Sequence, residues 1–280
     1  GITVKGGEAD FSAVVKRSRT VADGMSKGVQ FLLKKNKIDV ITGTGKVKAG
    51  KKIDVTADGK TTTYEAKYII IATGARSRAL PNFPQDGKKI IGYREAMTLS
   101  KMPKSMVVVG SGAIGSEFAY FYATMGTKVT LVEFMPNIVP VEDEEVSKQL
   151  GRSFKKIGIE VMTETNVESV DTKGTGCKVK IKNAKGEQTI ECEIVLSAVG
   201  IQANLEGVGL EEIGVAVDKG KILTNGFYQT NIPSIYAIGD CVGGQALAHV
   251  ASKEGIICVE KIVGHHPKPL DYNNIPGCTY

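Results

Sequence analysis

The sequence lacks long hydrophobic runs and long blocks of one charge. No apolar run approaches the ~20 residues that a membrane-spanning helix needs, and no signal-peptide pattern opens the chain. Lys and Arg (36) exceed Asp and Glu (30) to give a net charge of +6, but the excess is spread along the chain without a basic block. We therefore expect neither a membrane segment nor a nucleic-acid-binding surface, and we interpret the short lysine groups as solvated surface.

Closely spaced cysteines are also missing. The five cysteines, at positions 177, 192, 241, 258 and 278, are odd in number, and successive ones lie 15, 49, 17 and 20 residues apart. A secreted disulfide framework normally has an even number of paired cysteines. This pattern favours a reducing, cytoplasmic setting. The 280 residues, 42% hydrophobic and 24% charged, are ordinary for a globular protein and predict about two domains.

The most informative segment is the glycine-rich stretch Gly110-Ser111-Gly112-Ala113-Ile114-Gly115. An apolar run at 106–109 precedes it and a helical pattern at 116–125 follows it. A second strand-like run at 128–132 then ends on Glu133. Glycine-rich turns are common, so the motif alone would be weak. The order of strand, turn, helix, strand and acid predicts a dinucleotide-binding βαβ unit.

Each part of this unit has a physical role. Gly110 permits the tight turn, Gly112 lets the backbone approach a pyrophosphate, and Gly115 lets the helix pack closely on the strand. The helix N-terminus offers free N–H groups and roughly half a positive charge to the phosphates. Glu133, which follows Gly110 by 23 residues, is placed to accept hydrogen bonds from the adenosine ribose hydroxyls.

The same unit indicates which nicotinamide cofactor binds. A 2′-phosphate would need cations near the acid, yet residues 134–142 contain no Lys or Arg. The third fingerprint position is Gly115, where NADP-binding proteins often have alanine. We therefore predict NAD(H).

The rest of the chain shows strands alternating with helices, together with a small β-meander. Before the fingerprint we expect a helix at 9–35, a strand at 38–41, meander strands around 47 and at 52–56, 61–66 and 68–72, and a loop at 75–103. The last meander strand is continuously apolar and is expected to be buried on both faces. After the fingerprint we expect a helix at 142–156, strands at 159–162 and 167–170, a hairpin of 178–181 with 189–192, strands at 194–198, near 222–223 and at 234–240, and a helix at 246–263. This alternation predicts an α/β fold with a mostly parallel sheet.

Four motifs occur in an order that resembles a known family: Ile71-Ala72-Thr73-Gly74, the fingerprint, Ala198-Val199-Gly200, and Tyr236-Ala237-Ile238-Gly239-Asp240. The chain resembles the two-dinucleotide flavoprotein disulfide reductases, among them most closely the dihydrolipoamide dehydrogenases. The resemblance covers essentially the whole chain. It implies a Rossmann-like NAD-binding domain at 101–225, inserted in an incomplete FAD-binding domain at 1–100 and 226–270 that includes the meander. Residues 271–280 would begin a dimerisation domain.

The resemblance also implies roles for individual residues. For NAD it implies pyrophosphate binding by Gly110, Ser111, Gly112, Ala113, Ile114, Gly115, Ser116 and Glu117, ribose binding by Glu133, an adenine contact at Val167, and access for the nicotinamide half at Gly200. For FAD it implies Gly45 beside the adenine, Thr73, Gly74 and Ala75 along the adenosine, Asp240 on the ribityl chain, and Leu247, Ala248 and His249 along the pyrimidine end of the flavin. Glu117 would also support the flavin.

Structural interpretations remain open for several of these residues. Val167 is equally well read as a core residue, because buried valines are common. His249 is given no acid–base role, since a lone histidine near a helix start more often packs or caps. Glu117 could simply stabilise the first turn of its helix. Gly239-Asp240 and Thr73-Gly74 could each be an ordinary strand-end turn.

Three parts that the family needs are not found in this sequence. They are a second GxGxxG for FAD, a Cys-x4-Cys redox pair and a His–Glu dyad; His265-His266-Pro267 is better read as a helix-to-loop turn. We therefore expect a fragment, itself inactive and without catalytic residues or a metal, of a dihydrolipoyl dehydrogenase that passes electrons from dihydrolipoamide through a disulfide and FAD to NAD+. The implied partners of the parent are lipoyl domains of 2-oxo acid dehydrogenase complexes and a second copy in a homodimer. The alternatives are a mercuric or coenzyme A disulfide reductase and a non-catalytic NAD-binding module.

Overall fold

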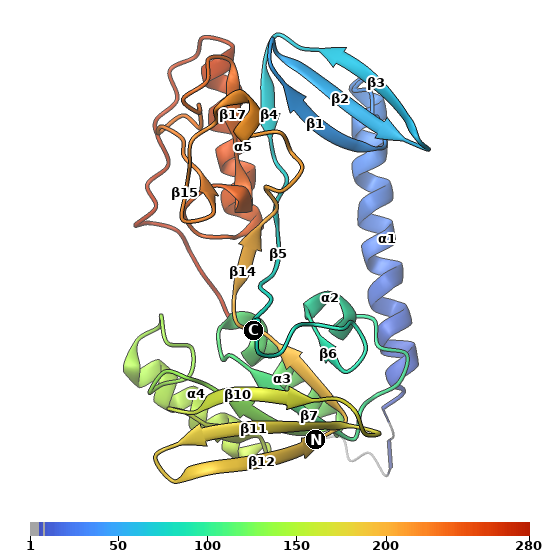
Figure 1. The fold of residues 1–280 in the computed structure, drawn as a ribbon, viewed down its shortest axis with the longest axis vertical. Helices are drawn as coiled ribbons and strands as arrows, with labels where there is room; N and C mark the ends of the chain where they lie inside the picture. Colours follow the sequence, from blue (N-terminus) through green and yellow to red (C-terminus); the bar gives the residue numbers. More distant parts are fainter. Residues whose placement is uncertain (1–5, 8) are drawn as a thin grey trace. The chain divides into compact units, whose positions relative to one another are not determined.

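The computed structural model describes residues 6, 7 and 9–280 and divides into two compact units (Figure 1). Unit 1 contains the described residues up to 37 together with 77–200 and 278–280, and unit 2 contains 38–76 and 201–277. The domain boundaries implied by the resemblance stay a prediction. Among the described residues, no helix combines the length and apolar character needed to span a bilayer.

A five-stranded parallel sheet lies at the centre of unit 1, with β7 in the middle. Its strands, in spatial order, are β6 (Ile90–Ile91), β13 (Ile194–Ser197), β7 (Ser105–Val109), β8 (Lys128–Val132) and β9 (Glu160–Met162). Residues 106–109 of β7 are all buried, as expected of a strand covered on both faces. The predicted mostly parallel α/β fold is therefore confirmed.

Strand β6 and the short helix α2 (Tyr93–Ala96) lie within the stretch that was expected to be a loop. The loop prediction for 75–103 is therefore wrong in part. A two-residue strand is too short to show a periodic pattern, and β6 exists because it pairs with Val195 and Leu196 of β13.

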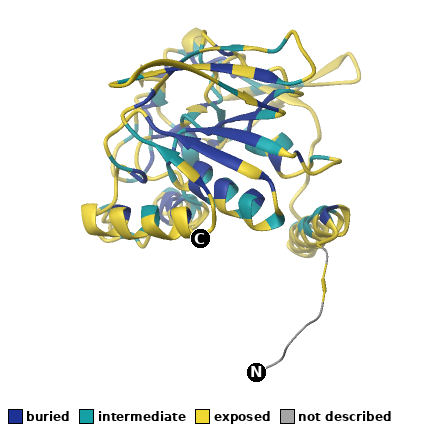
Figure 2. Ribbon diagram, turned by 90° about the horizontal axis from the view of Figure 1, so that it is seen from below, coloured by how far each residue is buried: buried dark blue, intermediate teal, exposed yellow. Residues whose placement is uncertain are grey.

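Three longer helices belong to unit 1, and each begins or ends where the sequence gives a clear signal. Helix α4 (Glu144–Lys156) begins after Asp143, whose carboxylate accepts the N–H of Glu145 at 2.8 Å. Helix α3 (Ala113–Met125) ends at Gly126 in the left-handed conformation. Helix α1 (Phe11–Lys35) begins after Asp10, but Phe11 is its only buried residue; the helix beyond the grey trace is mostly exposed in Figure 2.

The side chain of Tyr122 fixes α3 against the core of unit 1. It is 0% exposed, and its hydroxyl donates to the carbonyl oxygen of Ala96 at 2.6 Å. Burial raises the pKa of Tyr122 to about 12. The unfolded chain loses this proton near pH 10, whereas the folded chain keeps it until about pH 12.

Tyr122→Phe is therefore expected to flatten the alkaline stability profile of the protein. The free energy of unfolding of the wild type falls as the pH rises from 10 to 12, because only the unfolded state has released the proton. The tyrosine contributes roughly 2–3 kcal/mol of that fall. Denaturant titrations of both proteins at pH 8, 10 and 12 would measure it. Parallel profiles for the two proteins would contradict the assignment.

A three-stranded antiparallel sheet completes unit 1, formed by β10 (Asn166–Asp171), β11 (Cys177–Asn183) and β12 (Gly186–Cys192). Cys177, Val179 and Ile181 are buried, whereas the intervening lysines are exposed. This period of two confirms the predicted hairpin.

Unit 2 contains the meander β1 (Thr44–Lys48), β2 (Lys52–Ala57) and β3 (Lys60–Glu65), which confirms that prediction. Further strand pairs include β5 (Ala75–Ser77) with β14 (Ile201–Ala203) and β15 (Val217–Asp218) with β16 (Lys221–Ile222). The 3₁₀ helices η1 (Glu211–Ile213) and η2 (Gly239–Cys241) and the helix α5 (Ala248–Ile262) complete the unit.

Two strand predictions in unit 2 are wrong. Strand β4 (Ile69–Ile71) pairs in parallel with β17 (Ile235–Ala237) instead of joining the meander, and Ile70 is 37% exposed. In the described chain β4 pairs with β17 alone. The side chains of Ile69 and Ile71 are buried on one face of this pair, and that of Ile70 points to the opposite, exposed face. Residues 38–41 form no strand, and their apolar side chains are exposed. A strand needs a partner to satisfy its backbone groups, and no described strand pairs with these residues.

Candidate functional site

The fingerprint turn follows directly from the end of β7 in unit 1. Gly110 has φ +93, a region that favours glycine, and its N–H donates to the carbonyl of Val132 at 2.8 Å. A side chain at Gly110 would lie 2.5 Å from the carbonyl oxygen of Ala198 at the end of β13. The close approach of three strand ends therefore leaves no room for any other residue.

The other two glycines of the motif differ sharply in their surroundings. A Cβ atom at Gly115 would overlap the carbonyl oxygen of Gly110, so α3 packs on the turn only because this residue has no side chain. A Cβ atom at Gly112 would meet nothing within 4 Å. Gly112 is the N-cap of α3 and has no side-chain cap bond. The helix start thus faces open space with its first N–H groups unpaired within the helix, as an anion site requires.

Glu133 lies at the end of β8 and is joined to the fingerprint by hydrogen bonds. It is 7% exposed, and its Oε2 accepts the N–H of Ser111 at 2.8 Å and the hydroxyl of Ser111 at 2.6 Å. Its Oε1 accepts the N–H of Met135 at 2.8 Å. Three donors therefore hold one buried carboxylate beside the glycine turn.

Ser111 and Ser116 form further hydrogen bonds that stabilise the glycine turn. Ser111 accepts the N–H of Val139, at 3.0 Å on its carbonyl and 3.2 Å on its hydroxyl. Ser116 is 2% exposed, and its hydroxyl donates to the Ser111 carbonyl at 2.9 Å. The direct link between Ser111 and Glu133 was missed from the sequence. A hydroxyl residue between the first two glycines was the available signal.

The remaining residues predicted to bind NAD, Val167, Gly200 and Glu117, differ in their burial and in their contacts. The side chain of Val167 is 5% exposed and packs in an apolar cluster with Phe83 and Val179. Gly200 has φ +103 and follows β13, and a Cβ atom there would meet nothing within 4 Å. Glu117 is half-buried on α3, and its Oε1 accepts the N–H of Tyr280 at 3.0 Å.

Unit 2 contains the predicted FAD residues. Among them, the turn Gly239-Asp240 after β17 is held by hydrogen bonds from two directions. Gly239 has φ +72, and its N–H donates to Oε2 of Glu254 at 2.6 Å. Glu254 is 1% exposed, and its Oε1 accepts the Tyr272 hydroxyl at 2.6 Å. Lys221 Nζ donates to the carbonyl of Asp240 at 2.6 Å. Glu254 was missed from the sequence, although an acid on the apolar face of the last helix was a visible signal.

The loop after β4 is held by Asn204, the residue that follows β14. Gly74 has φ +67, and Asn204 donates to the carbonyls of Thr73 and Gly74 at 3.0 and 2.9 Å. Ala75 begins β5 and is half-buried. These bonds orient the segment that the resemblance places along an adenosine.

Gly45 has no steric need to be glycine in this structure. It pairs with Val55, and a Cβ atom there would lie 3.8 Å from Ile53 Cγ2, an ordinary contact. Gly43 is the crowded position, because a Cβ atom there would lie 2.6 Å from Val55 Cγ1. The adenine role of Gly45 stays a prediction.

The start of α5 presents the last three predicted FAD residues. Leu247 is its N-cap without a side-chain cap bond, and Ala248 is its first residue. His249 is exposed, and its Nε2 lies 3.0 Å from the carbonyl oxygen of Pro276. A free helix start suits a group with negative charge.

The parallel sheet, the glycine turn and the anchored carboxylate define a dinucleotide-binding α/β protein. A family profile described as pyridine nucleotide-disulphide oxidoreductase matches residues 3–255, and the chain belongs to this family. Its fold is that of the flavoproteins that bind two dinucleotides, and proteins of this family use FAD and NAD(H).

Individual relatives agree with the family. The chain is 44% identical to a dihydrolipoyl dehydrogenase of Zymomonas mobilis and 43% identical to one of Rhizobium etli, with all of this chain covered. It spans 61% and 62% of those two proteins. Among solved structures, LpdA from Mycobacterium tuberculosis is similar with a TM-score of 0.91 at 29% identity, over 98% of this chain and 61% of that one.

Proposed function

We propose that this chain is the NAD-binding part, with a portion of the FAD site, of a flavin-dependent dihydrolipoyl dehydrogenase. The observation that supports it most is the buried Glu133, tied to Ser111 beside the open helix start at Gly112. A carboxylate and an unpaired helix N-terminus side by side suit the ribose and the pyrophosphate of one cofactor. The dihydrolipoyl dehydrogenase names of the relatives suggest the reaction.

In this proposal the protein binds and orients, and the cofactors supply the redox chemistry. FAD, when bound, relays electrons between a disulfide and the nicotinamide. The N–H groups at the start of α3 bind the pyrophosphate, and Glu133 accepts hydrogen bonds from the ribose hydroxyls. Its negative charge also disfavours a 2′-phosphate at that position, which favours NAD(H) over NADP(H). Asp240, held by Lys221 and by the Gly239–Glu254 bond, would orient the ribityl chain.

The parent protein would act on dihydrolipoamide carried by lipoyl domains of 2-oxo acid dehydrogenase complexes, as a homodimer in the cytoplasm. The chain as given contains no Cys-x4-Cys pair to accept electrons from that substrate. We therefore infer that it binds NADH without turning over lipoamide. Cys177 and Cys192, 15 residues apart, do not have the spacing of that redox pair.

Isothermal titration of this chain with NADH and NADPH tests the proposal. We expect NADH to bind at least about tenfold more tightly than NADPH, because burying charge next to charge costs more than about 1.4 kcal/mol. An assay of NADH-dependent lipoamide reduction on the same sample should give no rate above background. Equal affinity for the two cofactors would refute the role of Glu133. Lipoamide turnover, or tightly held flavin in the visible absorbance spectrum, would refute the inference that the site is partial.

A further inference from the structure

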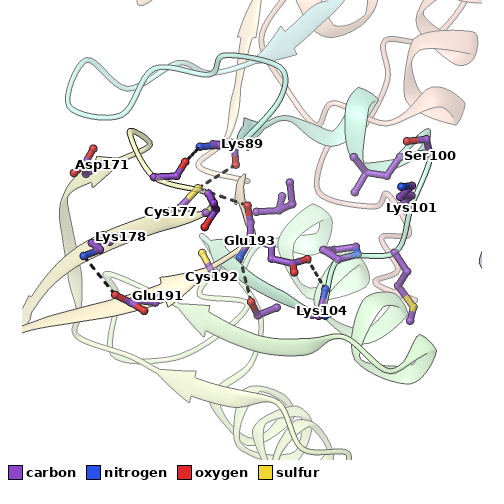
Figure 3. Close-up of a pocket in the computed structure, with 18 residues that line it drawn as sticks. Lys89, Ser100, Lys101, Lys104, Asp171, Cys177, Lys178, Glu191, Cys192 and Glu193 are labelled. Atoms are coloured by element: carbon purple, nitrogen blue, oxygen red, sulfur yellow. Dashed lines mark hydrogen bonds and ion pairs between the residues drawn. The ribbon is translucent and has the colours of Figure 1, made fainter.

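A cavity of about 940 Å³ lies in unit 1 at the edge of the sheet opposite to the fingerprint. Ser105 and Ile194, where β7 and β13 begin, line it, whereas the glycine turn follows the ends of these strands. Cys177 and Cys192 also line the cavity (Figure 3). No step of the proposed NAD or FAD binding uses either cysteine.

The two cysteines are direct cross-strand partners. Cys177 at the start of β11 pairs with Cys192 at the end of β12, and both side chains are buried, at 2% and 7% exposure. Residues opposite each other in an antiparallel pair have Cα atoms about 4.5 or 5.5 Å apart and point to the same face. Both separations fall inside the range of about 4.4–6.8 Å that a disulfide spans. Both cysteines are free thiols in this structure.

The surrounding backbone holds the pair at the cavity wall. The thiol of Cys177 donates to the carbonyls of Lys89 and Glu193, with sulfur–oxygen distances of 3.7 and 3.8 Å. A side chain at Gly176 would lie 2.5 Å from the carbonyl oxygen of Cys192, so β11 approaches β12 closely next to the pair. Neither sulfur needs a change of backbone pairing to reach the other.

The charged groups around the pair make its two thiols unequal. Burial raises the pKa of both thiols, that of Cys192 to about 12. For Cys177 the positive charge of Lys89 and the adjacent Cys192 side chain oppose the rise in pKa, and Asp86 adds to it. Lys89 is fixed there because its Nζ donates to the carbonyl of Thr172 at 2.6 Å and also to that of Gly174. Cys177 is thus the thiol that ionises first.

The other charged groups that line the cavity are partly engaged with one another. Glu193 Oε2 accepts the N–H of Lys104 at 2.8 Å, and Lys178 lies 3.6 Å from Glu191 in an exposed ion pair. Asp171, the last residue of β10, and Lys101 complete the set. Lys89 is therefore the cation whose charge opposes the rise in the pKa of the Cys177 thiol.

We propose that Cys177 and Cys192 form a second dithiol site, which takes a low-molecular-weight disulfide from the cavity and closes into an intramolecular disulfide. The Cys177 thiolate attacks one sulfur of the disulfide, forming a mixed disulfide and releasing the other half as a thiolate. Cys192 loses its proton and attacks Cys177 Sγ, which closes the internal bond and releases the second half. The two cysteines lose two hydrogens and two electrons, and these reduce one disulfide to two thiols.

The reaction is controlled by ionisation, because only the thiolate attacks. Below the pKa of Cys177 the thiolate fraction rises about tenfold per pH unit, so the rate of disulfide formation should rise about tenfold from pH 7 to pH 8. The exposed Cys278 would react in parallel and must be removed by Cys278→Ser in every protein tested.

The test is to incubate the Cys278→Ser chain with oxidised glutathione at pH 7 and pH 8 and to follow its intact mass and its peptide map. We expect a loss of the mass of two hydrogens and a peptide in which Cys177 is linked to Cys192. The internal bond should raise the Tm by about 5 °C, since it lowers the conformational entropy of the unfolded chain. Cys177→Ser and Cys192→Ser should each abolish the mass loss, and Cys177→Ala and Cys192→Ala serve if either serine variant fails to fold.

Cys258→Ser is the matched control, because Cys258 is equally buried but belongs to unit 2 and does not line the cavity, and it should leave the mass loss unchanged. A mixed disulfide with glutathione that persists, a bond to another cysteine, or no modification at pH 8 would each overturn the proposal. NADH affinity measured on the same samples reports separately on the function proposed above, since the fingerprint lies at the other edge of the sheet.

Discussion

Gly115→Ala is expected to abolish NADH binding and to destabilise unit 1, whereas Gly112→Ala is expected to weaken NADH binding in a protein that remains folded. The two substitutions add the same methyl group, three residues apart in one motif. Their surroundings differ, because a Cβ atom at Gly115 overlaps the Gly110 carbonyl oxygen and a Cβ atom at Gly112 meets nothing within 4 Å.

The overlap at Gly115 cannot be relieved by rotating a side chain. The obstructing atom belongs to the backbone of Gly110, whose N–H is bonded to Val132 and whose α-carbon faces the Ala198 carbonyl. Helix α3 must therefore move away from β7, which disrupts the packing of Tyr122 and Ala119, both 0% exposed. Overpacking of this kind costs about 3 kcal/mol or more. Movement of α3 also withdraws the N–H groups that would bind the pyrophosphate, so the affinity for NADH should fall more than about 100-fold.

Gly112→Ala separates the loss of binding from the loss of folding. Gly112 has φ −60, which alanine adopts freely, and as an N-cap residue alanine costs about 0.5–1 kcal/mol. The added methyl group would occupy the space into which the pyrophosphate approaches, so we expect at least a tenfold weaker affinity for NADH. Urea unfolding and isothermal titration of both variants measure the two effects. A stable Gly115→Ala protein with unchanged NADH affinity would refute this account of the turn.

The sequence was sufficient for the fingerprint unit because local and tertiary requirements coincide there. The apolar run of β7, the glycine turn and the end of α3 at Gly126 each leave a signal within a few residues. The meander was predictable for the same reason, since Asp58 and Gly59 form its turn with φ +49 and +74.

The sequence failed where a partner strand or a distant side chain decides the structure. The apolar sequence of Ile69–Ile71 is compatible with burial on both faces of a sheet. The exposed fraction of Ile70 nevertheless depends on which strands flank β4. Likewise, β6 exists through β13, more than 100 residues further along the chain. The residues predicted to bind NAD lie in unit 1 and those predicted to bind FAD lie in unit 2, and the contacts that hold them come from Ser111, Asn204 and Glu254. Local patterns do not show which atoms those side chains reach.

Glu133→Gln is expected to collapse the preference for NADH over NADPH, and this substitution tests the proposed cofactor site most directly. Both oxygens of Glu133 accept hydrogen bonds, Oε2 from Ser111 and Oε1 from Met135. A glutamine has one oxygen, so its NH₂ group must face a backbone N–H in a buried position. Leaving a buried donor unsatisfied costs about 1–3 kcal/mol, which should appear as a loss of unfolding free energy.

The same substitution acts on the two cofactors in different ways. For NADH, the ribose hydroxyls lose a charged acceptor, and hydrogen bonds to charged groups contribute about 1.5–3 kcal/mol, so Kd should rise about 10- to 100-fold. For NADPH, the loss of that acceptor is offset by the loss of repulsion between the carboxylate and the 2′-phosphate, so Kd should change less than about threefold. Ser111→Ala is the matched control, because it removes the hydroxyl donor at 2.6 Å and keeps the carboxylate and its two backbone donors. It should therefore keep the preference for NADH, and a Glu133→Gln protein that kept it as well would show that Glu133 supports the turn without contacting the ribose.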